Sequence, residues 1–266
     1  MVAVSKSSRK VRELRKLLRK GAYRDETNTF VIEGQSLLRE AVLTGNAPID
    51  IFIAEDSSHV ISGIGELNSE ELKIWELEAA TLKSVASTQN PQSVLAIVPM
   101  VDLSFDELIN SSPDFLVIGF KISDPGNAGT IIRTAAAAGA NGVIFSEGSV
   151  DIYNPKVVRA SAGAIFRIPV IRSMNASDVL RSCKQSGIRA LGLSSHGSTS
   201  YDALNFNHPL ALVVGNETRG LTELAPDSLT AEISIPMEAG VESLNVAAAL
   251  SVVSYEVWRQ RAANDL

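Results

Sequence analysis

The feature that most constrains the fold is the succession of apolar strands and helical patterns in the second half of the chain. Strands are expected at 114–120, 142–148, 188–195, 210–217 and 232–237, and helices at 127–140, 155–166, 177–187 and 244–262. Most of these strands are apolar almost throughout. Such strands, when they alternate with helices, form a parallel sheet that is covered on both faces. The expected fold is therefore α/β, with ligands bound beyond the carboxyl ends of the strands.

The first hundred residues are expected to form a smaller α/β module. The expected elements are a basic amphipathic helix at 11–20, a strand and a helix within 30–45, strands at 49–56, 73–77 and 93–100, and a short helix at 80–87. A Ser-Ser-Pro sequence at 111–113 ends a linker with one or two helical turns. We therefore expect a domain at 1–100, a linker at 101–113 and a larger domain at 114–266.

Charge is distributed unevenly along the chain. Residues 1–24 contain nine Lys and Arg and one acid, so this segment carries +8 and the other 242 residues carry −14 of the total of −6. This asymmetry favours a polyanionic partner for the basic end, with Lys16, Arg19 and Lys20 as candidate contacts. The alternative is a helix with a solvated, charged outer face. The acidic remainder predicts a localised contact with nucleic acid.

Several classes of protein are disfavoured by composition and by missing motifs. No apolar run approaches the ~20 residues that cross a bilayer, and no apolar segment of a signal peptide follows the basic N-terminus. The single cysteine, Cys183, excludes an internal disulfide and fits a reducing cytosol. With only three scattered histidines, a zinc or iron site is not expected. The sequences GxxxxGK[ST], GxGxxG and GxSxG are absent, which disfavours P-loop, standard dinucleotide and serine-hydrolase sites.

Three strand ends combine glycine or proline with polar side chains. They are ISDPGNAGTIIRTAAAAG at 122–139, VVGNETRGL at 213–221 and SIPMEAGVESLNVAAAL at 234–250. Their candidate polar residues are Asn127, expected to cap a helix, Arg133, Glu217, Arg219, Ser243 and Asn245. Taken singly, each stretch also suits a tight loop or an ordinary helix cap. The three in series indicate a site.

These stretches resemble the three motifs of the SpoU/TrmH family of RNA ribose 2′-O-methyltransferases, within the SPOUT superfamily. The motifs occur in the family's order and spacing, and the resemblance covers about 113–262. In the N-terminal part, FVIEGQSLLREA and SVASTQNPQSVLAIV are similar to the ribosomal-protein-like substrate-binding domain of many family members. The resemblance implies a parallel-sheet SPOUT domain with a C-terminal trefoil knot, preceded by a small α/β substrate-binding domain.

The resemblance also implies a cofactor, S-adenosylmethionine (SAM), and roles for individual residues. Around the cofactor it places Gly215, Ile235, Leu244, Leu193 and Met237. It places Arg133 beside the ribose, oriented by Asn127, Glu217, Ser243 and Asn245. A guanidinium has a pKa above ~12 and resists acting as a base. We therefore expect Arg133 to stabilise the developing alkoxide and to hold a phosphate.

Three further residues, Lys156, Arg159 and Ser161, match family positions, and we expect them to contact RNA or a partner subunit. The alternative is that they cap and solvate a helix. The last helix carries two apolar stripes, Leu244, Ala248, Val252 and Tyr255, and Val246, Leu250, Val253 and Val257. A helix that is apolar over most of its circumference is covered on two sides. One side is expected on the sheet and the other on a second subunit, because the family typically forms homodimers with composite sites. A large monomeric core is the alternative.

The leading functional hypothesis is a cytoplasmic, SAM-dependent methyltransferase that acts on the ribose of ribosomal RNA. A tRNA ribose methyltransferase is the alternative within the same class. A non-catalytic RNA-binding or assembly factor would use only the basic arm, and a small-molecule dehydrogenase would use a doubly wound sheet. The expected partners are RNA and a second copy of the chain, without a membrane or a metal.

Overall fold

The chain divides into two compact units, which are described separately. The computed structural model describes residues 1–62, 64, 72–86, 91–216, 219–225 and 227–263. The first unit comprises residues 1–101 and 153–167, and the second comprises 102–152 and 168–266. This division differs from the expected domains in two places. Residues 153–167 pack with the N-terminal part, and the expected linker supplies a helix to the second unit.

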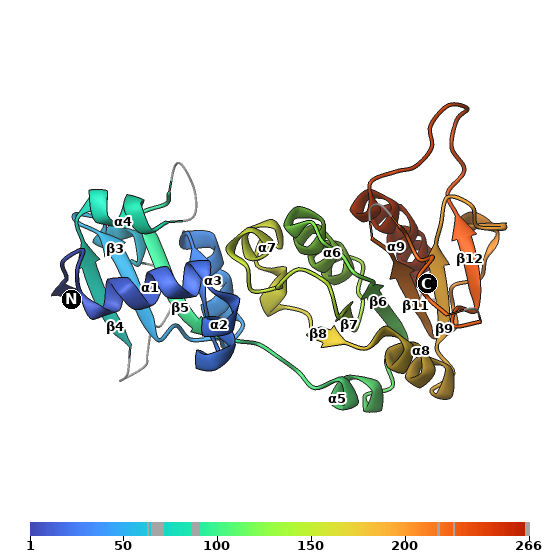
Figure 1. The fold of residues 1–266 in the computed structure, drawn as a ribbon, viewed down its shortest axis with the longest axis horizontal. Helices are drawn as coiled ribbons and strands as arrows, with labels where there is room; N and C mark the ends of the chain where they lie inside the picture. Colours follow the sequence, from blue (N-terminus) through green and yellow to red (C-terminus); the bar gives the residue numbers. More distant parts are fainter. Residues whose placement is uncertain (63, 65–71, 87–90, 217–218, 226, 264–266) are drawn as a thin grey trace. The chain divides into compact units, whose positions relative to one another are not determined.

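The first unit is built on a five-stranded mixed sheet with the strand order β1-β4-β3-β5-β2 (Figure 1). Its strands are β1 (Val2–Ala3), β2 (Thr29–Glu33), β3 (Asp50–Ala54), β4 (Lys73–Leu77) and β5 (Val94–Pro99). Its helices are α1 (Arg9–Arg19), α2 (Gly21–Thr27), α3 (Gln35–Leu43), α4 (Ala79–Val85) and α7 (Pro155–Ala160), with short 3-10 turns at Ser58–Val60 and Ala164–Phe166. β5 runs antiparallel to β2 and β3, whereas β1, β3 and β4 are parallel.

The basic helix predicted at the N-terminus is confirmed as α1. Its apolar stripe, Val11, Leu14 and Leu17, is buried in the core of the first unit, and its basic residues cover the outer face. One of them turns inward, because Lys10 Nζ lies 2.8 Å from a carboxylate oxygen of the buried Asp50. Hydrophobic burial and this ion pair fix the helix, so its remaining cations are presented on a firmly held surface.

The second unit contains a seven-stranded sheet with the order β10-β12-β9-β11-β6-β7-β8, in which every pair is parallel. Its strands are β6 (Phe115–Gly119), β7 (Gly142–Ser146), β8 (Val170–Met174), β9 (Arg189–Leu193), β10 (Thr199–Ser200), β11 (Leu210–Val214) and β12 (Ala231–Ser234). Its helices are α5 (Phe105–Asn110), α6 (Pro125–Ala137), α8 (Ala176–Gln185) and α9 (Val246–Ala262), with a 3-10 turn at Tyr201–Ala203. The predicted α/β class with a parallel sheet is confirmed.

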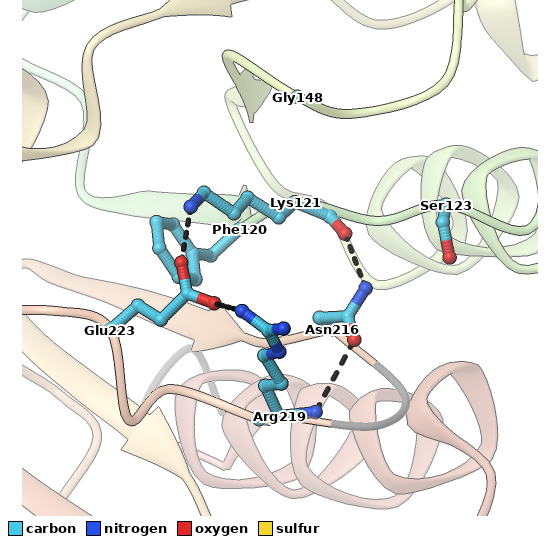
Figure 2. A pocket seen from close by; sticks show the side chains of 8 residues that line it. Phe120, Lys121, Ser123, Gly148, Asn216, Arg219 and Glu223 are labelled. Carbon is cyan, nitrogen blue, oxygen red and sulfur yellow. Dashed lines mark hydrogen bonds and ion pairs between the residues drawn. The ribbon is translucent and has the colours of Figure 1, made fainter.

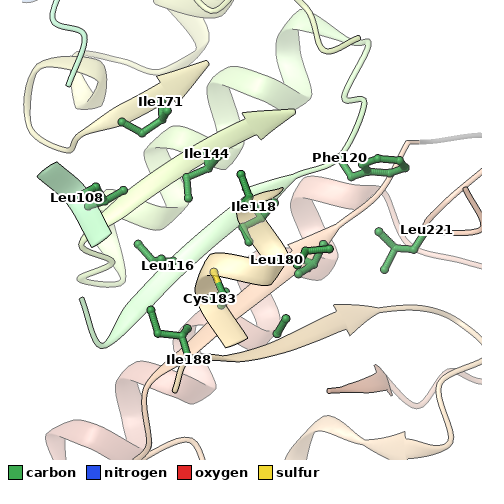
Figure 3. Close-up of a cluster of buried hydrophobic side chains, with 14 residues drawn as sticks. Leu108, Leu116, Ile118, Phe120, Ile144, Ile171, Leu180, Cys183, Ile188 and Leu221 are labelled. Carbon is green, nitrogen blue, oxygen red and sulfur yellow. The ribbon is translucent and has the colours of Figure 1, made fainter. Parts of the chain in front are cut away.

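Helices cover this sheet on both faces. On one face, Leu108 of α5 and Leu180 and Cys183 of α8 pack against side chains of the central strands (Figure 3). On the other face, α6 and α9 pack against each other and against the sheet. The central strands β6, β7 and β11 are buried throughout, as their apolar sequences predict. Burial also raises the pKa of the Cys183 thiol to about 11, so this group stays protonated at neutral pH.

Several elements differ from the sequence-based expectation. β8 and the short α2 were not expected, because both are short and mix polar with apolar residues. The two-residue strands β1 and β10 were not expected either. The helix expected at 155–166 ends at Ala160, since Ala162 and Gly163 adopt positive φ angles of 50° and 91° that interrupt a right-handed helix. A bulky side chain at Gly163 would also meet Glu40, whose Cγ lies 2.7 Å from the position of a Cβ.

Candidate active site

The candidate site lies in the second unit, at the carboxyl ends of β6, β11 and β12. The chain after β6 leads into α6, and the chain after β12 leads into α9. The first turns of these two helices are joined by a hydrogen bond of 2.9 Å, donated by Asn245 Nδ2 to Asn127 Oδ1. About two turns further along each helix, the hydroxyls of Thr134 and Ser251 lie 3.0 Å apart. The two helices therefore run parallel, with both N-termini at the same edge. Two residues predicted as catalytic, more than a hundred positions apart in sequence, are thus in direct contact.

Asn245 has a second task, which is to cap α9. Its Oδ1 accepts hydrogen bonds from the backbone N–H groups of Ala247, at 2.9 Å, and Ala248, at 3.3 Å. The amide oxygen therefore satisfies donors of the helix, and the amide nitrogen holds Asn127. Both the oxygen and the nitrogen of this amide are hydrogen-bonded, so the position where the loop ends and α9 begins is fixed.

The helix cap expected at Asn127 is assigned instead to Asp124. The Asp124 carboxylate accepts a 2.8 Å hydrogen bond from the backbone N–H of Asn127, and Pro125 occupies the first helical position. An Asp-Pro sequence is a strong helix start, so the cap lies three residues earlier than expected. As a consequence, the side chain of Asn127 does not cap α6, and its amide oxygen accepts the hydrogen bond from Asn245.

Arg133 lies exposed on α6, and no hydrogen bond or ion pair joins it to another residue that the structure describes. It follows Asn127 by six residues, which corresponds to about 9 Å along the helix axis and a rotation of about 240°. The structure therefore does not bring Arg133 together with the Asn127–Asn245 pair of the same chain. Its guanidinium is a cation available to an anionic ligand on the outer surface of α6.

The residues predicted to surround a cofactor lie at neighbouring strand ends. Leu193 ends β9, Gly215 follows β11 and Ile235 follows β12, and these three strands are adjacent in the sheet. Leu193, Ile235 and Met237 are half-buried, and Leu244 is 41% exposed. Apolar side chains that the protein core leaves partly uncovered can pack against the apolar parts of a ligand.

Gly215 occupies the tightest position of this region. A Cβ at this position would lie 2.3 Å from the carbonyl carbon and oxygen of Gly220, which are backbone atoms that cannot swing aside. Asn216 and Gly220 form an isolated antiparallel bridge, and the Gly220 N–H donates to the Asn216 carbonyl at 2.8 Å. The loop after β11 therefore closes on itself, and glycine is required at its start for steric reasons.

The remaining predicted site residues are distributed as follows. Glu217 lies outside the described residues, and Ser243 is exposed in the segment before α9. On the first unit, Lys16, Arg19 and Lys20 are exposed, and Lys16 Nζ lies 5.0 Å from the centroid of the Tyr23 ring. Lys156 is exposed on α7, whereas Arg159 is half-buried with Nη1 3.7 Å from a carboxylate oxygen of Glu33.

The site also includes a charged cluster that was not predicted, in which Arg219 of the second motif is joined by Glu223 and Lys121. The Lys121 ammonium pairs with one carboxylate oxygen of Glu223, and Arg219 Nη1 lies 2.7 Å from the other (Figure 2). The Asn216 side chain donates to the Lys121 carbonyl at 2.9 Å. The ion pairs, that with Lys121 foremost, hold the pKa of the Glu223 carboxyl below its usual range. Single charged residues in two separate loops give no periodic signal, so the sequence alone did not reveal this cluster.

Comparison with known proteins decides the family. The sequence model of the SpoU rRNA Methylase family matches residues 114–255, which is more than half of the chain. The chain belongs to the SpoU rRNA methylase family. The model of the MRM3-like substrate-binding domain matches residues 8–96. The resemblance drawn from the three motifs and from the N-terminal module is confirmed, as is the enzyme class that it implies.

The relatives of this SpoU family member include a ribosomal RNA methyltransferase. The chain is 30% identical over 253 residues to the 23S rRNA (guanosine(2553)-2′-O)-methyltransferase RlmP of Bacillus subtilis, a match that covers 95% of this chain and 97% of the relative. The crystal structure of the SpoU methyltransferase AviRb from Streptomyces viridochromogenes in complex with AdoMet superposes with a TM-score of 0.85, at 28% identity, over 96% of this chain and 98% of the other. The cofactor of that structure is the one predicted for this chain.

A structure concerned with 2-OH methylation of C/U34 on tRNA is similar over a smaller part. It has a TM-score of 0.51 and 27% identity, and it covers 57% of this chain although 99% of its own length is matched. In the part of our chain that the structure describes, no three His, Cys, Asp or Glu side chains are grouped as metal ligands. None of the described helices has the length and apolar character needed to cross a membrane.

Proposed function

We propose that this protein is a SAM-dependent RNA 2′-O-ribose methyltransferase whose substrate is ribosomal RNA. The observation that carries the proposal is the match over nearly the whole chain to a relative named for 2′-O-methylation of 23S rRNA. That match includes the N-terminal module, whereas the matched structure named for tRNA covers little more than half of the chain. The alternative, a tRNA 2′-O-methyltransferase, would leave the N-terminal module without a counterpart in that relative.

The geometry of the second unit fits the proposed cofactor. Gly215 provides backbone without a side chain at the carboxyl end of β11, and Leu193, Ile235 and Met237 leave apolar surface partly uncovered around it. An adenine ring needs such an apolar slot with backbone hydrogen-bonding groups at its edge. When bound, SAM supplies a methyl group on a sulfonium, which is already an activated leaving group. The chain's own residues then have to position the ribose in line with that methyl group and stabilise the charge on its oxygen.

We assign Arg133 to stabilise the negative charge that develops on the ribose 2′-oxygen. Because a guanidinium does not release its proton near neutral pH, it acts by stabilising the 2′-alkoxide and by holding an adjacent phosphate. The hydrogen bond between Asn127 and Asn245 joins the starts of α6 and α9, and we assign this pair to orientation of Arg133 and the ribose. Glu217 and Ser243 are assigned to orientation of the ribose by their match to the family motifs. The proposal further includes a trefoil knot formed by the chain between β12 and α9.

We also propose that the protein is a homodimer. The two stripes predicted on the last helix differ in burial: Leu250, Val253 and Val257 are fully buried, whereas Val252 and Tyr255 are 39% and 50% exposed. Trp258, which was not assigned to either stripe, is 51% exposed. An exposed apolar stripe of this size on one helix is typical of an interface between subunits. A dimer would also resolve the separation of Arg133 from the Asn127–Asn245 pair, because the arginine of one subunit could complete the site of the other.

The dimer predicts a specific oligomeric change. Replacing Tyr255 and Trp258 together by Glu should convert a dimer into a monomer, because two charges would have to be buried in an apolar interface. Sedimentation equilibrium measures the mass directly, and circular dichroism checks that the exposed substitutions leave the fold intact. A matched double variant of exposed residues elsewhere, Lys73→Glu and Lys83→Glu, should stay dimeric. A monomeric wild-type protein that is fully active would contradict the proposal.

The basic face of α1 is proposed to contact the RNA. Replacing Lys16, Arg19 and Lys20 by Gln should weaken RNA binding and reduce the slope of log Kd against log salt by about 2 to 3, since each phosphate contact contributes about 0.7 to 0.9. The control replaces three other exposed cations of the first unit, Arg39, Lys73 and Lys83, by Gln. An unchanged salt slope in the α1 variant would show that these residues do not contact RNA and only form a solvated, charged surface.

The experiment that tests the function is transfer of labelled methyl from SAM to unmodified ribosomal RNA, followed by alkaline hydrolysis. A 2′-O-methyl group blocks cleavage of its own phosphodiester, so the label is expected in alkali-resistant dinucleotides. Label in mononucleotides would indicate base methylation instead. A parallel reaction with unmodified tRNA separates the two RNA classes, and RNA binding without any transfer would favour a binding or assembly factor. With such a substrate, we place the protein in the cytoplasm.

A further inference from the structure

A cavity of about 270 Å³ lies at the carboxyl ends of β6 and β11. The described residues that line it are Phe120, Lys121, Ser123, Gly148, Asn216, Arg219, Gly220 and Glu223 (Figure 2). Its volume is slightly below the ~300–1,000 Å³ of sites that enclose a small molecule. The cavity therefore suits one group of a larger ligand better than a complete cofactor. None of the residues predicted for SAM lines it.

Two cations and one anion define the chemistry of this cavity. Lys121 and Arg219 both pair with Glu223, one on each carboxylate oxygen, so the cluster has one positive charge in excess. The side chains are 42%, 72% and 31% exposed, respectively, which leaves the pairs accessible to solutes. The pKa of the Glu223 carboxyl is lowered by these partners, so the carboxylate is ionised at neutral pH. The Glu223 carboxylate is itself an oxyanion, so the separation of the two cations that it holds also suits another bound oxyanion.

The backbone that carries the two cations is also fixed. Lys121 adopts a φ angle of 50°, which is uncommon for a residue with a side chain, and the Asn216 amide holds its carbonyl at 2.9 Å. The Asn216 Oδ1 in turn accepts from the backbone N–H of Arg219 at 3.3 Å. One side chain thus ties together the two loops that bear Lys121 and Arg219. This arrangement positions the cations before any ligand binds, which reduces the cost of ordering them.

The cavity shares its loops with the proposed reaction site. Ser123, on its wall, immediately precedes the Asp124 cap of α6, and this helix bears Asn127. Asn216, which also lines the cavity, immediately follows Gly215 at the proposed cofactor loop. A group bound in the cavity would therefore lie close to the bound ribose. In an RNA chain, the oxyanion nearest to a ribose is a phosphodiester.

We propose that this cavity binds a phosphodiester of the RNA substrate adjacent to the methylated ribose, and that the phosphate displaces Glu223 from Lys121 and Arg219. The inference rests on the proposed function and extends it to a second anchoring point on the RNA. Lysine and arginine together are suited to phosphate, since the ammonium supplies a point charge and the guanidinium a two-pronged hydrogen-bond donor. Glu223 keeps the cations in place in the free protein and competes with the phosphate.

Displacement of Glu223 gives the proposal a signature that a purely structural cluster lacks. If the cluster only braces the two loops, then loss of any of its three members should weaken RNA binding or leave it unchanged. If a phosphate replaces Glu223, loss of a cation weakens RNA binding, but loss of the carboxylate charge strengthens it. The Glu223→Gln substitution removes that charge and keeps the shape of the side chain. Opposite signs for Lys121→Gln and Glu223→Gln are therefore the decisive result.

The experiment measures binding of unmodified ribosomal RNA, transcribed in vitro, to the full-length variants Lys121→Gln, Arg219→Gln and Glu223→Gln at several salt concentrations. We expect each cation variant to bind RNA about 3- to 10-fold more weakly and to lose about 0.7 to 0.9 from the salt slope. We expect Glu223→Gln to bind RNA several-fold more tightly, with SAM affinity unchanged in all three variants. Arg181→Gln is the control, because Arg181 is an exposed arginine that pairs with Asp178 outside the cavity.

Each contrary outcome has a defined meaning. Cation variants with the salt slope of the wild type would overturn the inference, and methyl transfer by the wild type would show that the proposed function stands regardless. Weaker RNA binding by Glu223→Gln, equal to that of Lys121→Gln, would make the cluster a structural brace. Reduced affinity for SAM with unchanged affinity for RNA would assign the cavity to the carboxylate of the cofactor. A wild-type protein that neither binds nor methylates RNA would refute the proposed function itself.

Discussion

The Arg133→Ala variant is expected to lose methyl transfer almost completely while it folds and binds SAM as the wild type does. Arg133 is exposed and has no hydrogen bond or ion pair to another described residue, so its removal leaves no buried group unpaired. Removal of one group that stabilises charge in a transition state typically lowers kcat by about 10²- to 10³-fold. Single-turnover transfer to ribosomal RNA measures the chemical step, and thermal unfolding with and without SAM measures fold and cofactor binding.

Two further variants give this prediction its specificity. Arg133→Lys should recover part of the rate, because an ammonium keeps the charge but lacks the two-pronged geometry of a guanidinium. Arg181→Ala on α8 should be as active as the wild type, although it also removes an exposed arginine of the second unit. An Arg133→Ala enzyme with the full single-turnover rate would show that the assignment is wrong. A variant that loses rate and SAM affinity together would instead place Arg133 at the cofactor.

The central strands of the large sheet could be predicted because the apolar pattern of their sequences agrees with the burial that the fold gives them. The apolar runs of β6, β7 and β11 are buried on both faces, which is the one environment that such runs tolerate. The elements that were missed lie at edges. β8 is partly exposed and carries Arg172 and Ser173, so no apolar pattern distinguishes it from a loop. Its pairing with β7 is decided by tertiary contacts rather than by its own sequence.

The candidate site was predictable only in part, because some of its contacts join residues that are far apart in the sequence. The three motifs assigned Asn127 and Asn245 to one site, and the structure joins these two side chains by a hydrogen bond that the sequence did not predict. The cap of α6 was misassigned, because both Asp124 and Asn127 are good capping residues and only the Asp-Pro sequence distinguishes them. The Lys121–Glu223–Arg219 cluster escaped notice altogether. Its members are ordinary surface charges until the fold brings two loops 102 residues apart into contact.

The second large effect is expected from Gly215→Ala, which should abolish SAM binding. The added methyl group would lie 2.3 Å from backbone atoms of Gly220, so the loop after β11 has to open. Since this loop is proposed to surround the cofactor, we expect Kd for SAM to rise at least ~100-fold, equivalent to about 2.7 kcal/mol of binding free energy. Isothermal calorimetry measures Kd, and the rise in Tm that saturating SAM produces in the wild type should disappear.

The matched control is Gly192→Ala in the adjacent strand β9. Its Cβ would approach the Cδ1 atoms of Leu221 and Leu229 at 2.7 Å, but these are the tips of flexible side chains that can move away. Both variants add one methyl group to a buried glycine near the carboxyl edge of the same sheet. Gly192→Ala should therefore lose some stability and keep its affinity for SAM. Equal affinities of Gly215→Ala and Gly192→Ala for SAM would show that cofactor binding does not depend on the closed loop between β11 and Gly220. The proposed cofactor site would then be wrong.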